Sequence, residues 1–131
     1  MVAVVIGTHG KLSEEILKSS EMISGKQENI GYIKVEVEEG LSDLVSKYAE
    51  EINKLDTKDG VLFLVDFFGG SSYNAASMIA IKNKNIKNMD IVTGVNIKMI
   101  LKIVKSMKFL NLEDLVNLAL IAGGFSIRTF R

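Results

Sequence analysis

The sequence contains no cysteine and only one histidine, His9. The absence of cysteine excludes disulfide bonds, thiolate metal sites and cysteine nucleophiles. One histidine cannot supply a metal centre that needs several histidine ligands, so we expect no metal and no cofactor. The chain also has a formal net charge of zero, because 16 basic residues are matched by 16 acidic ones. A neutral chain lacks the electrostatic footprint of a nucleic-acid-binding protein, so nucleic acid is not an expected partner.

Long hydrophobic runs are also missing. The apolar stretch at residues 2–6 has no basic residues before it and is too short for a signal peptide or a membrane span. The longer apolar segments, residues 61–68 and 115–125, are interrupted by Asp66 and Asn117. We therefore expect a cytoplasmic protein, for which any membrane role comes through a partner.

The residues that are present suffice for one folded domain. The chain has 131 residues, of which 47% are hydrophobic and 24% charged, as in ordinary soluble globular proteins. A chain of this length buries roughly two-thirds of its extended surface, which allows a full core. We therefore expect a single domain over residues 1–131.

Strand-like and helix-like patterns alternate along this domain. Apolar or alternating runs typical of strands occur at residues 2–6, 32–37, 61–65, 90–95 and 125–130. Apolar stripes at helical spacing occur at residues 13–22, 41–55, 73–83, 97–107 and 112–122. This order predicts an α/β fold with a doubly wound, mainly parallel sheet.

Two features of this sheet can be stated further. In the common strand order 2-1-3-4, the buried runs at residues 2–6 and 61–65 are neighbours at the centre. The final strand, residues 125–130, follows two helices without a crossover. Its direction therefore stays open: it is antiparallel at an edge of the sheet, or it pairs with another subunit.

The carboxyl ends of the first and third strands predict the functional site. In open α/β sheets ligands bind where the strand order reverses, which for the order 2-1-3-4 lies between these two strands. His9 follows the first strand and Asp66 follows the third. The topology therefore predicts that the only histidine and this carboxylate face each other.

This pair indicates one type of chemistry. A neutral imidazole is a nucleophile through one nitrogen, and a carboxylate on the other nitrogen fixes the tautomer and stabilises the charged product. The sequence Gly69-Gly70-Ser71-Ser72 begins a helix and offers backbone N–H groups to a phosphate, and Gly10 opens the first helix in the same way. Together these residues predict phosphoryl transfer onto His9.

Simpler interpretations exist for each residue. If it has no role in transfer, His9 is a polar surface residue. Asp66 is then a turn former or a helix cap. Phe67 and Phe68 either pack inside or form a docking patch beside the site. The residues around His9 are not a Walker A loop, because Val5 replaces its first glycine and Leu12 replaces its Ser/Thr.

Several blocks in register resemble the enzyme IIA domain of the mannose-type sugar phosphotransferase system. The blocks are VIGTHG at residues 5–10, EM at 21–22 with Gly25 and QEN at 27–29, GVLFLVD at 60–66, GGS at 69–71, NAAS at 74–77, and GVNI at 94–97 with Met99. The resemblance covers almost the whole chain and is weakest after Ile100. It implies a phosphotransferase that carries a phosphoryl group from HPr to the IIB component, with the IIC and IID membrane components served indirectly.

The resemblance also implies roles for individual residues. It places the phosphoryl group on Nε2 of His9 and Asp66 on the other ring nitrogen. Ser71 matches a family residue beside the phosphohistidine, and Thr8 lies in the same loop. Family members form homodimers that exchange a C-terminal strand, which would account for residues 125–130.

Two positions depart from the family pattern, because Ser72 and Lys98 stand where family members commonly carry proline. Other hypotheses stay open on the sequence alone. The chain could be the phosphotransfer subunit of a dihydroxyacetone kinase system, which differs in its acceptor. It could also be a regulatory module that binds without transferring, or a flavodoxin-like nucleotide binder. The sequence does not name the sugar.

Overall fold

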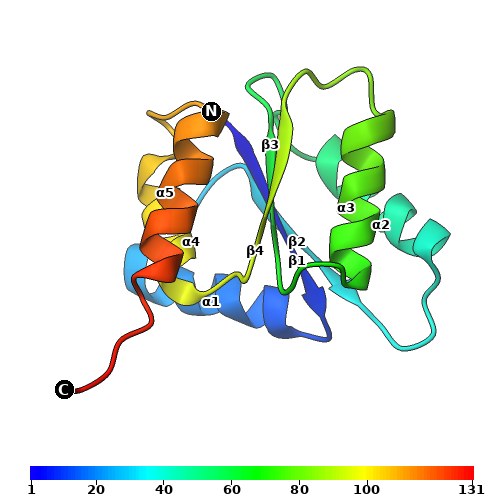
Figure 1. Ribbon diagram of the computed structural model, residues 1–131. Helices are drawn as coiled ribbons and strands as arrows, with labels where there is room; N and C mark the ends of the chain where they lie inside the picture. Colours follow the sequence, from blue (N-terminus) through cyan, green and yellow to red (C-terminus); the bar gives the residue numbers. More distant parts are fainter.

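The computed structural model describes residues 1–131, and its strands and helices alternate along the chain (Figure 1). The strands are β1 (Ala3–His9), β2 (Ile30–Val35), β3 (Val61–Val65) and β4 (Met89–Thr93). The helices are α1 (Leu12–Ser24), α2 (Leu41–Asn53), α3 (Ser71–Lys82), α4 (Ile97–Ser106) and α5 (Leu112–Gly124). The four strands are parallel and form one sheet in the order β2-β1-β3-β4. The predicted fold class and strand order are confirmed.

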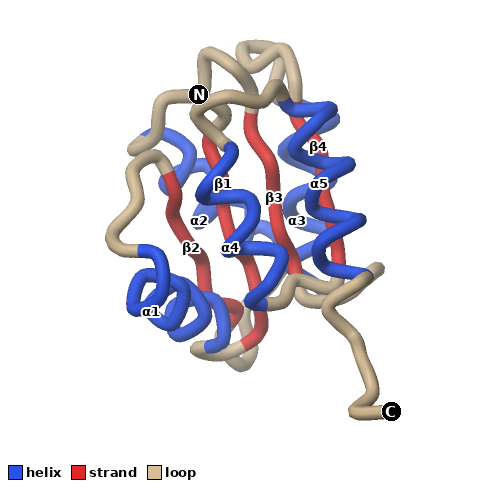
Figure 2. Tube along the Cα trace, turned by 90° about the vertical axis from the view of Figure 1, so that its left-hand side faces the viewer, coloured by secondary structure: helices blue, strands red, loops and turns tan.

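Helices cover both faces of this sheet. Helices α2 and α3 pack on one face, and α1, α4 and α5 pack on the other (Figure 1, Figure 2). A parallel sheet covered on both sides needs apolar residues at every position of its central strands. The continuous apolar runs of β1 and β3 meet this need, since Val61 through Val65 are all fully buried.

Successive side chains of the central strands enter different cores. In β1, Val4 and Ile6 belong to the core under α1, α4 and α5, whereas Ala3 and Val5 belong to the core under α2 and α3. Strand β3 follows the same alternation, because neighbouring side chains of a strand point to opposite faces. The protein therefore has two hydrophobic cores, one on each face of the sheet.

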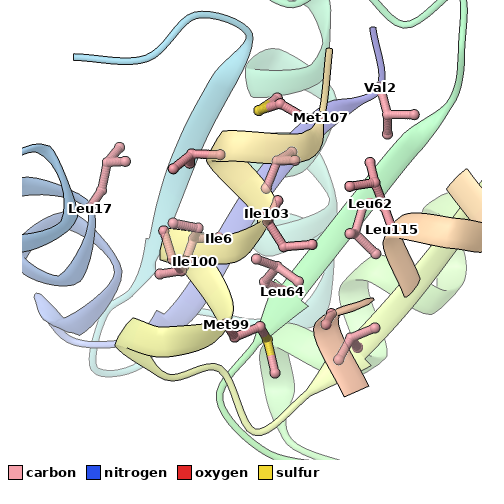
Figure 3. Packing of buried hydrophobic residues seen from close by; sticks show 14 residues of the cluster. Val2, Ile6, Leu17, Leu62, Leu64, Met99, Ile100, Ile103, Met107 and Leu115 are labelled. Atoms are coloured by element: carbon pink, nitrogen blue, oxygen red, sulfur yellow. The ribbon is translucent and has the colours of Figure 1, made fainter. Parts of the chain in front are cut away.

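The core under α4 shows how a helix attaches to the sheet. Ile100 and Ile103 of α4 are fully buried, and their side chains point toward Ile6 and Leu64 of the central strands (Figure 3). Removing a side chain of this kind typically costs about 2–5 kcal/mol of stability. This packing fixes α4 against the sheet.

The structure corrects two of the predicted strands. The second strand is Ile30–Val35 rather than residues 32–37, because its pairing with β1 runs from Val4 opposite Ile30 to His9 opposite Val35. The predicted final strand at residues 125–130 is not formed within the chain. Ile127 and Phe130 of this tail are exposed, and no strand of the chain pairs with it.

The helices are all short in relation to a bilayer. None combines the length and the apolar composition that crossing a membrane requires.

Candidate functional site

The site lies at the carboxyl ends of the two central strands. Strands β1 and β3 are neighbours, and the helices that follow them, α1 and α3, pack on opposite faces of the sheet. This divergence marks the usual ligand site of open α/β sheets. His9 is the last residue of β1, and Asp66 directly follows β3. The strand order therefore brings together residues that are 57 positions apart in the sequence.

Asp66 holds His9 by two hydrogen bonds. The Nδ1 atom of His9 lies 2.7 Å from Asp66 Oδ2, and the backbone N–H of His9 donates to the same oxygen at 2.9 Å. The other carboxylate oxygen, Oδ1, accepts a hydrogen bond from the backbone N–H of Phe67 at 3.1 Å. Both oxygens of the carboxylate are thus fixed by the ends of the two strands.

This geometry selects the reactive ring nitrogen. An ionised carboxylate only accepts hydrogen bonds, so Nδ1 of His9 carries the proton that it shares with Asp66. The Nε2 atom is then the unprotonated nitrogen of the neutral ring. The His9 side chain is 46% exposed, whereas that of Asp66 is 14% exposed. The ring therefore reaches the surface while its supporting carboxylate stays inside.

The pKa of Asp66 reports the same arrangement. Partial burial raises the pKa of this carboxyl, but hydrogen bonds from the backbone and ring of His9, with that from Phe67, outweigh the burial. The net result is a pKa below the ordinary value for an aspartate. Asp66 is therefore ionised at neutral pH and available to stabilise positive charge on the imidazole.

Phe67 covers one face of the His9 ring. Its ring stacks on that of His9, with centroids 5.3 Å apart and planes 11° apart. The ring also fills the space beside Gly70, where a Cβ atom would lie 2.8 Å from two ring carbons. A side chain at position 70 would therefore displace the Phe67 ring, and Phe67 limits the rotation of His9.

Phe68 follows Phe67 in the chain and faces outward. It is 74% exposed, and its ring contacts that of Tyr73 at a centroid distance of 4.6 Å. Phe67 is itself 53% exposed. The two phenylalanines, predicted as packing residues or as a docking patch, are therefore surface residues, and Phe67 contacts His9.

Helix α3 presents its N-terminus at this edge. The first backbone hydrogen bond of the helix runs from Asn74 to the carbonyl of Gly70. The N–H groups of Ser71, Ser72 and Tyr73 precede this bond and have no partner within the helix. Ser71 is exposed, whereas the N–H of Gly70 itself donates to the carbonyl of Phe67 at 3.4 Å. The free donors are thus those of the first turn rather than that of Gly70.

Thr8 and Gly10 are placed differently from the sequence prediction. The Thr8 side chain is fully buried, and its hydroxyl accepts a hydrogen bond from the backbone N–H of Ser13 in the first turn of α1. The backbone N–H of Gly10 donates to the carbonyl of Val35. The Gly10 N–H is therefore occupied within the protein, and the Thr8 hydroxyl is buried away from the surface where a phosphate would arrive.

A hollow of about 430 Å³ adjoins His9 on the side of β2. Its lining residues are His9, Gly10, Lys11, Lys34, Val35, Glu36 and Val37. Val37 is 91% exposed. Lys11 is exposed and forms no ion pair, while Lys34 is bonded to Glu14 at 3.2 Å. Lys11 and Val37 are not among the site residues predicted from the sequence, although the pairing of β2 with β1 brings the end of β2 to the same edge.

The side chains around His9 do not form a metal centre. No group of three or more His, Cys, Asp or Glu side chains is arranged to hold an ion. The site instead combines one oriented imidazole, one ionised carboxylate and a helix N-terminus. These groups suit a nucleophile that receives an anionic group.

Comparison with known protein families gives a match over most of the chain. A family described as the PTS system fructose IIA component, where PTS denotes the phosphotransferase system, matches residues 3–120. The mannose-specific EIIAB component of Escherichia coli is 46% identical over 101 residues. That match covers 77% of this chain and 30% of the relative, so the chain spans under a third of the Escherichia coli protein. The fructose-specific EIIA component of Bacillus subtilis is 34% identical over 117 residues, which cover 89% of this chain and 78% of the relative.

Solved structures agree with these sequence matches. The phosphotransferase system component EIIA from Streptococcus agalactiae superposes with a TM-score of 0.89 at 25% identity, over 99% of this chain and 98% of that one. The mannose/sorbose-specific IIA subunit from Enterococcus faecalis superposes with a TM-score of 0.87 at 25% identity, over 99% and 95% of the two chains.

Proposed function

The chain belongs to the family of the PTS fructose IIA component, of the mannose type, and on this premise we propose that it is a phosphohistidine carrier. His9 accepts a phosphoryl group from the phosphohistidine of HPr and passes it to the IIB component. One observation carries the proposal: Nδ1 of His9 is held by Asp66 at 2.7 Å, which leaves Nε2 as the nucleophilic nitrogen of a partly exposed ring.

The transfer is a displacement at phosphorus between two imidazoles. The lone pair of His9 Nε2 forms a bond to phosphorus as the bond to the donor nitrogen breaks, and that electron pair returns to the donor imidazole. Positive charge develops on the His9 ring, and the carboxylate of Asp66 stabilises it through the Nδ1–H hydrogen bond. Transfer to the acceptor reverses these steps. The two nitrogens have similar basicity, so the reaction requires no cofactor.

The first turn of α3 forms the receiving cradle. The phosphoryl oxygens accept hydrogen bonds from backbone N–H groups at Ser71 and the residues that follow it, and the positive end of the helix dipole favours their charge. The Ser71 side chain is exposed at the start of this turn, which allows its hydroxyl to join them.

Partner proteins dock over His9 in this account. Phe67, Phe68 and Val37 are large, exposed apolar side chains around it. Apolar and aromatic side chains of this kind form the centres of protein interfaces. HPr and IIB use the same surface in turn, because both need access to Nε2. The sugar is taken up by the membrane components IIC and IID, with this chain acting as a single domain in the cytoplasm.

The exposed tail supports a homodimer. Phe125, Ile127 and Phe130 are 71%, 85% and 103% exposed, which is a high cost for apolar side chains in water. Strand β4 is an edge of the sheet with one unpaired side. We propose that the tail pairs with β4 of a second copy. This exchange would bury the apolar tail and pair the open edge of β4.

Phosphorylation by a reconstituted donor chain tests the proposed function. Phosphoenolpyruvate, enzyme I and HPr are mixed with the protein, and intact mass is followed before and after acid treatment. We expect an acid-labile gain of one phosphoryl group that disappears in His9→Gln. A stable adduct, or labelling of His9→Gln equal to that of the wild type, would contradict the proposal.

A further inference from the structure

Two buried hydroxyl groups lie beneath the site without a hydrogen-bond partner. The side chains of Tyr48 and Ser72 are both fully buried, and neither Tyr48 Oη nor Ser72 Oγ forms a hydrogen bond of good geometry with any group. The Ser72 hydroxyl is nevertheless close enough to the Tyr48 phenol to lower its pKa, so each is the other's available partner. Buried polar groups in folded proteins are nearly always satisfied, so each exception needs an explanation. The phosphoryl-transfer steps described above use neither group.

Gly7 brings these two hydroxyls together. A Cβ atom at Gly7 would lie 1.9 Å from Tyr48 Oη and 3.3 Å from Ser72 Oγ, so both oxygens border the space that glycine leaves empty. Gly7 pairs with Val65 in the sheet. Gly7 lies two residues before His9 on β1, and Val65 directly precedes Asp66 on β3. The hydroxyls therefore lie one layer below the His9–Asp66 pair.

The electrostatics of Tyr48 show the same neighbours. Burial raises the pKa of the Tyr48 phenol, the Ser72 hydroxyl lowers it, and the negative charge of Asp66 raises it. The pKa of Tyr48 is thus affected both by Ser72, in the first turn of α3, and by Asp66, which supports the histidine. The phenol keeps its proton at neutral pH, and its oxygen both donates and accepts hydrogen bonds.

Packing restricts where the phenol can go. Tyr48 lies on α2, and its ring meets the ring of Phe63 edge-on, at 5.3 Å between centroids and 84° between planes. Ser72 is the second residue of α3. A contact between the two hydroxyls therefore ties the rigid α2 side of the core to the turn that presents its N–H groups to a phosphate.

We propose that Tyr48 is a positioning residue whose hydroxyl pairs with that of Ser72 and so holds the first turn of α3 against Gly7. The bond sets where the N–H groups of Ser71, Ser72 and Tyr73 meet the phosphoryl group on His9. This inference rests on the proposed function, since it concerns the geometry of the same site. Tyr48 touches no reacting atom, and its effect passes through Ser72.

Three variants and one control test this role. Tyr48→Phe removes the phenol oxygen and keeps the ring, Ser72→Ala removes the matching hydroxyl, and a double variant removes both. Tyr32→Phe is the matched control, because its hydroxyl bonds to Glu14 at 2.9 Å on the opposite face of the sheet. Each protein is loaded with phosphoramidate, a small donor that bypasses protein docking, and loading rate, phosphohistidine lifetime and melting temperature are measured.

We expect Tyr48→Phe and Ser72→Ala each to slow loading about five-fold, the effect of one hydrogen bond. The double variant should be no slower than the slower single variant, because both changes break the same contact. Tyr32→Phe should load at the wild-type rate. Wild-type loading by Tyr48→Phe would overturn the inference, as would losses that multiply in the double variant or a loss that only follows a lowered melting temperature.

A second measurement separates this inference from the proposed function. Inorganic phosphate is titrated into the wild type and Tyr48→Phe while the amide NMR shifts of Ser71, Ser72 and Tyr73 are followed. If wild-type His9 accepts no phosphoryl group from any donor, the proposed function fails and this titration decides the inference. We expect phosphate binding to be about five-fold weaker in Tyr48→Phe; equal affinities would overturn the positioning role.

Discussion

Asp66 Oδ2 accepts both hydrogen bonds that His9 directs toward β3, from the backbone N–H at 2.9 Å and from ring Nδ1 at 2.7 Å. Two donors from one residue meet at one oxygen, so the contact fixes the rotation of the imidazole as well as its tautomer. The second oxygen is held by the N–H of Phe67. The orientation of Nε2 is thus determined by the ends of two adjacent strands.

Replacing Asp66 by asparagine removes the charge and keeps the shape. We expect the rate of phosphoryl transfer through His9 to fall roughly ten- to hundred-fold, the range of a charge-assisted hydrogen bond. The melting temperature should fall by a few degrees only, a smaller effect than that on the rate, because the carboxylate lies at the partly open edge of the sheet. Quench-flow loading from HPr measures the rate. Asp90→Asn, at the start of β4, serves as the control, and an unchanged rate in Asp66→Asn would remove Asp66 from the mechanism.

Acid should remove the contribution of Asp66 to stability. The pKa of Asp66 is lowered from the ordinary value of 3.8, so the unfolded chain binds a proton more readily than the folded protein. The contribution is therefore complete above about pH 4 and is lost as the pH falls through the lowered folded value. Urea unfolding of the wild type and Asp66→Asn across this range should show a gap in stability that closes in acid. A gap that is constant with pH would contradict the lowered pKa.

Phe68 should matter for partners and not for chemistry. Its ring is 74% exposed beside the site, so truncation to alanine removes contact area without disturbing the His9–Asp66 bonds. We expect the KM for HPr to rise about five-fold or more, with loading by phosphoramidate unchanged. Phe109→Ala is the control, because Phe109 is 83% exposed after α4, at the opposite end of the sheet. Equal KM values for Phe68→Ala and the wild type would exclude Phe68 from the interface.

Glycine is required at position 7 but not at position 124. A Cβ at Gly7 would lie 1.9 Å from Tyr48 Oη, whereas a Cβ at Gly124 meets no atom within 4 Å. Gly7→Ala should therefore lower the free energy of unfolding by about 1–3 kcal/mol through overpacking. Gly124→Ala, within α5, should be neutral or raise it by up to about 1 kcal/mol. Chemical denaturation measures both, and a neutral Gly7→Ala would show that Tyr48 moves away freely.

The centre of the sheet could be predicted from the sequence because its signals are local and strong. Residues 61–65 form an apolar run between Gly60 and Asp66, and the strand has these bounds in the structure. Once two such runs lie side by side, parallel topology places His9 against Asp66. The central pair of the site followed from these two facts.

Features that depend on register or on distant partners could not be predicted. The alternating pattern around residues 30–37 fits more than one strand boundary, and pairing with β1 decides between them. Thr8 and Gly10 lie next to His9 in sequence, yet Ser13 and Val35 occupy their hydrogen-bonding groups. No local pattern indicates such contacts.

Tyr48 shows the same limit. Its place in the apolar stripe of residues 41–55 correctly predicts a buried side chain. Nothing in that stripe indicates that its hydroxyl ends beside Ser72 and Gly7. That contact follows only from how α2 and α3 pack on the sheet.

The position of the phosphoryl group on the His9 ring tests directly whether Asp66 selects Nε2 as the nucleophile. The protein is labelled with nitrogen-15 histidine, phosphorylated, and examined by nitrogen-15 and phosphorus-31 NMR, and its single histidine gives one imidazole to interpret. We expect phosphorus on Nε2 of His9, with a protonated Nδ1 still bonded to Asp66. Phosphorus on Nδ1, or no phosphohistidine at all in a folded protein, would contradict this expectation.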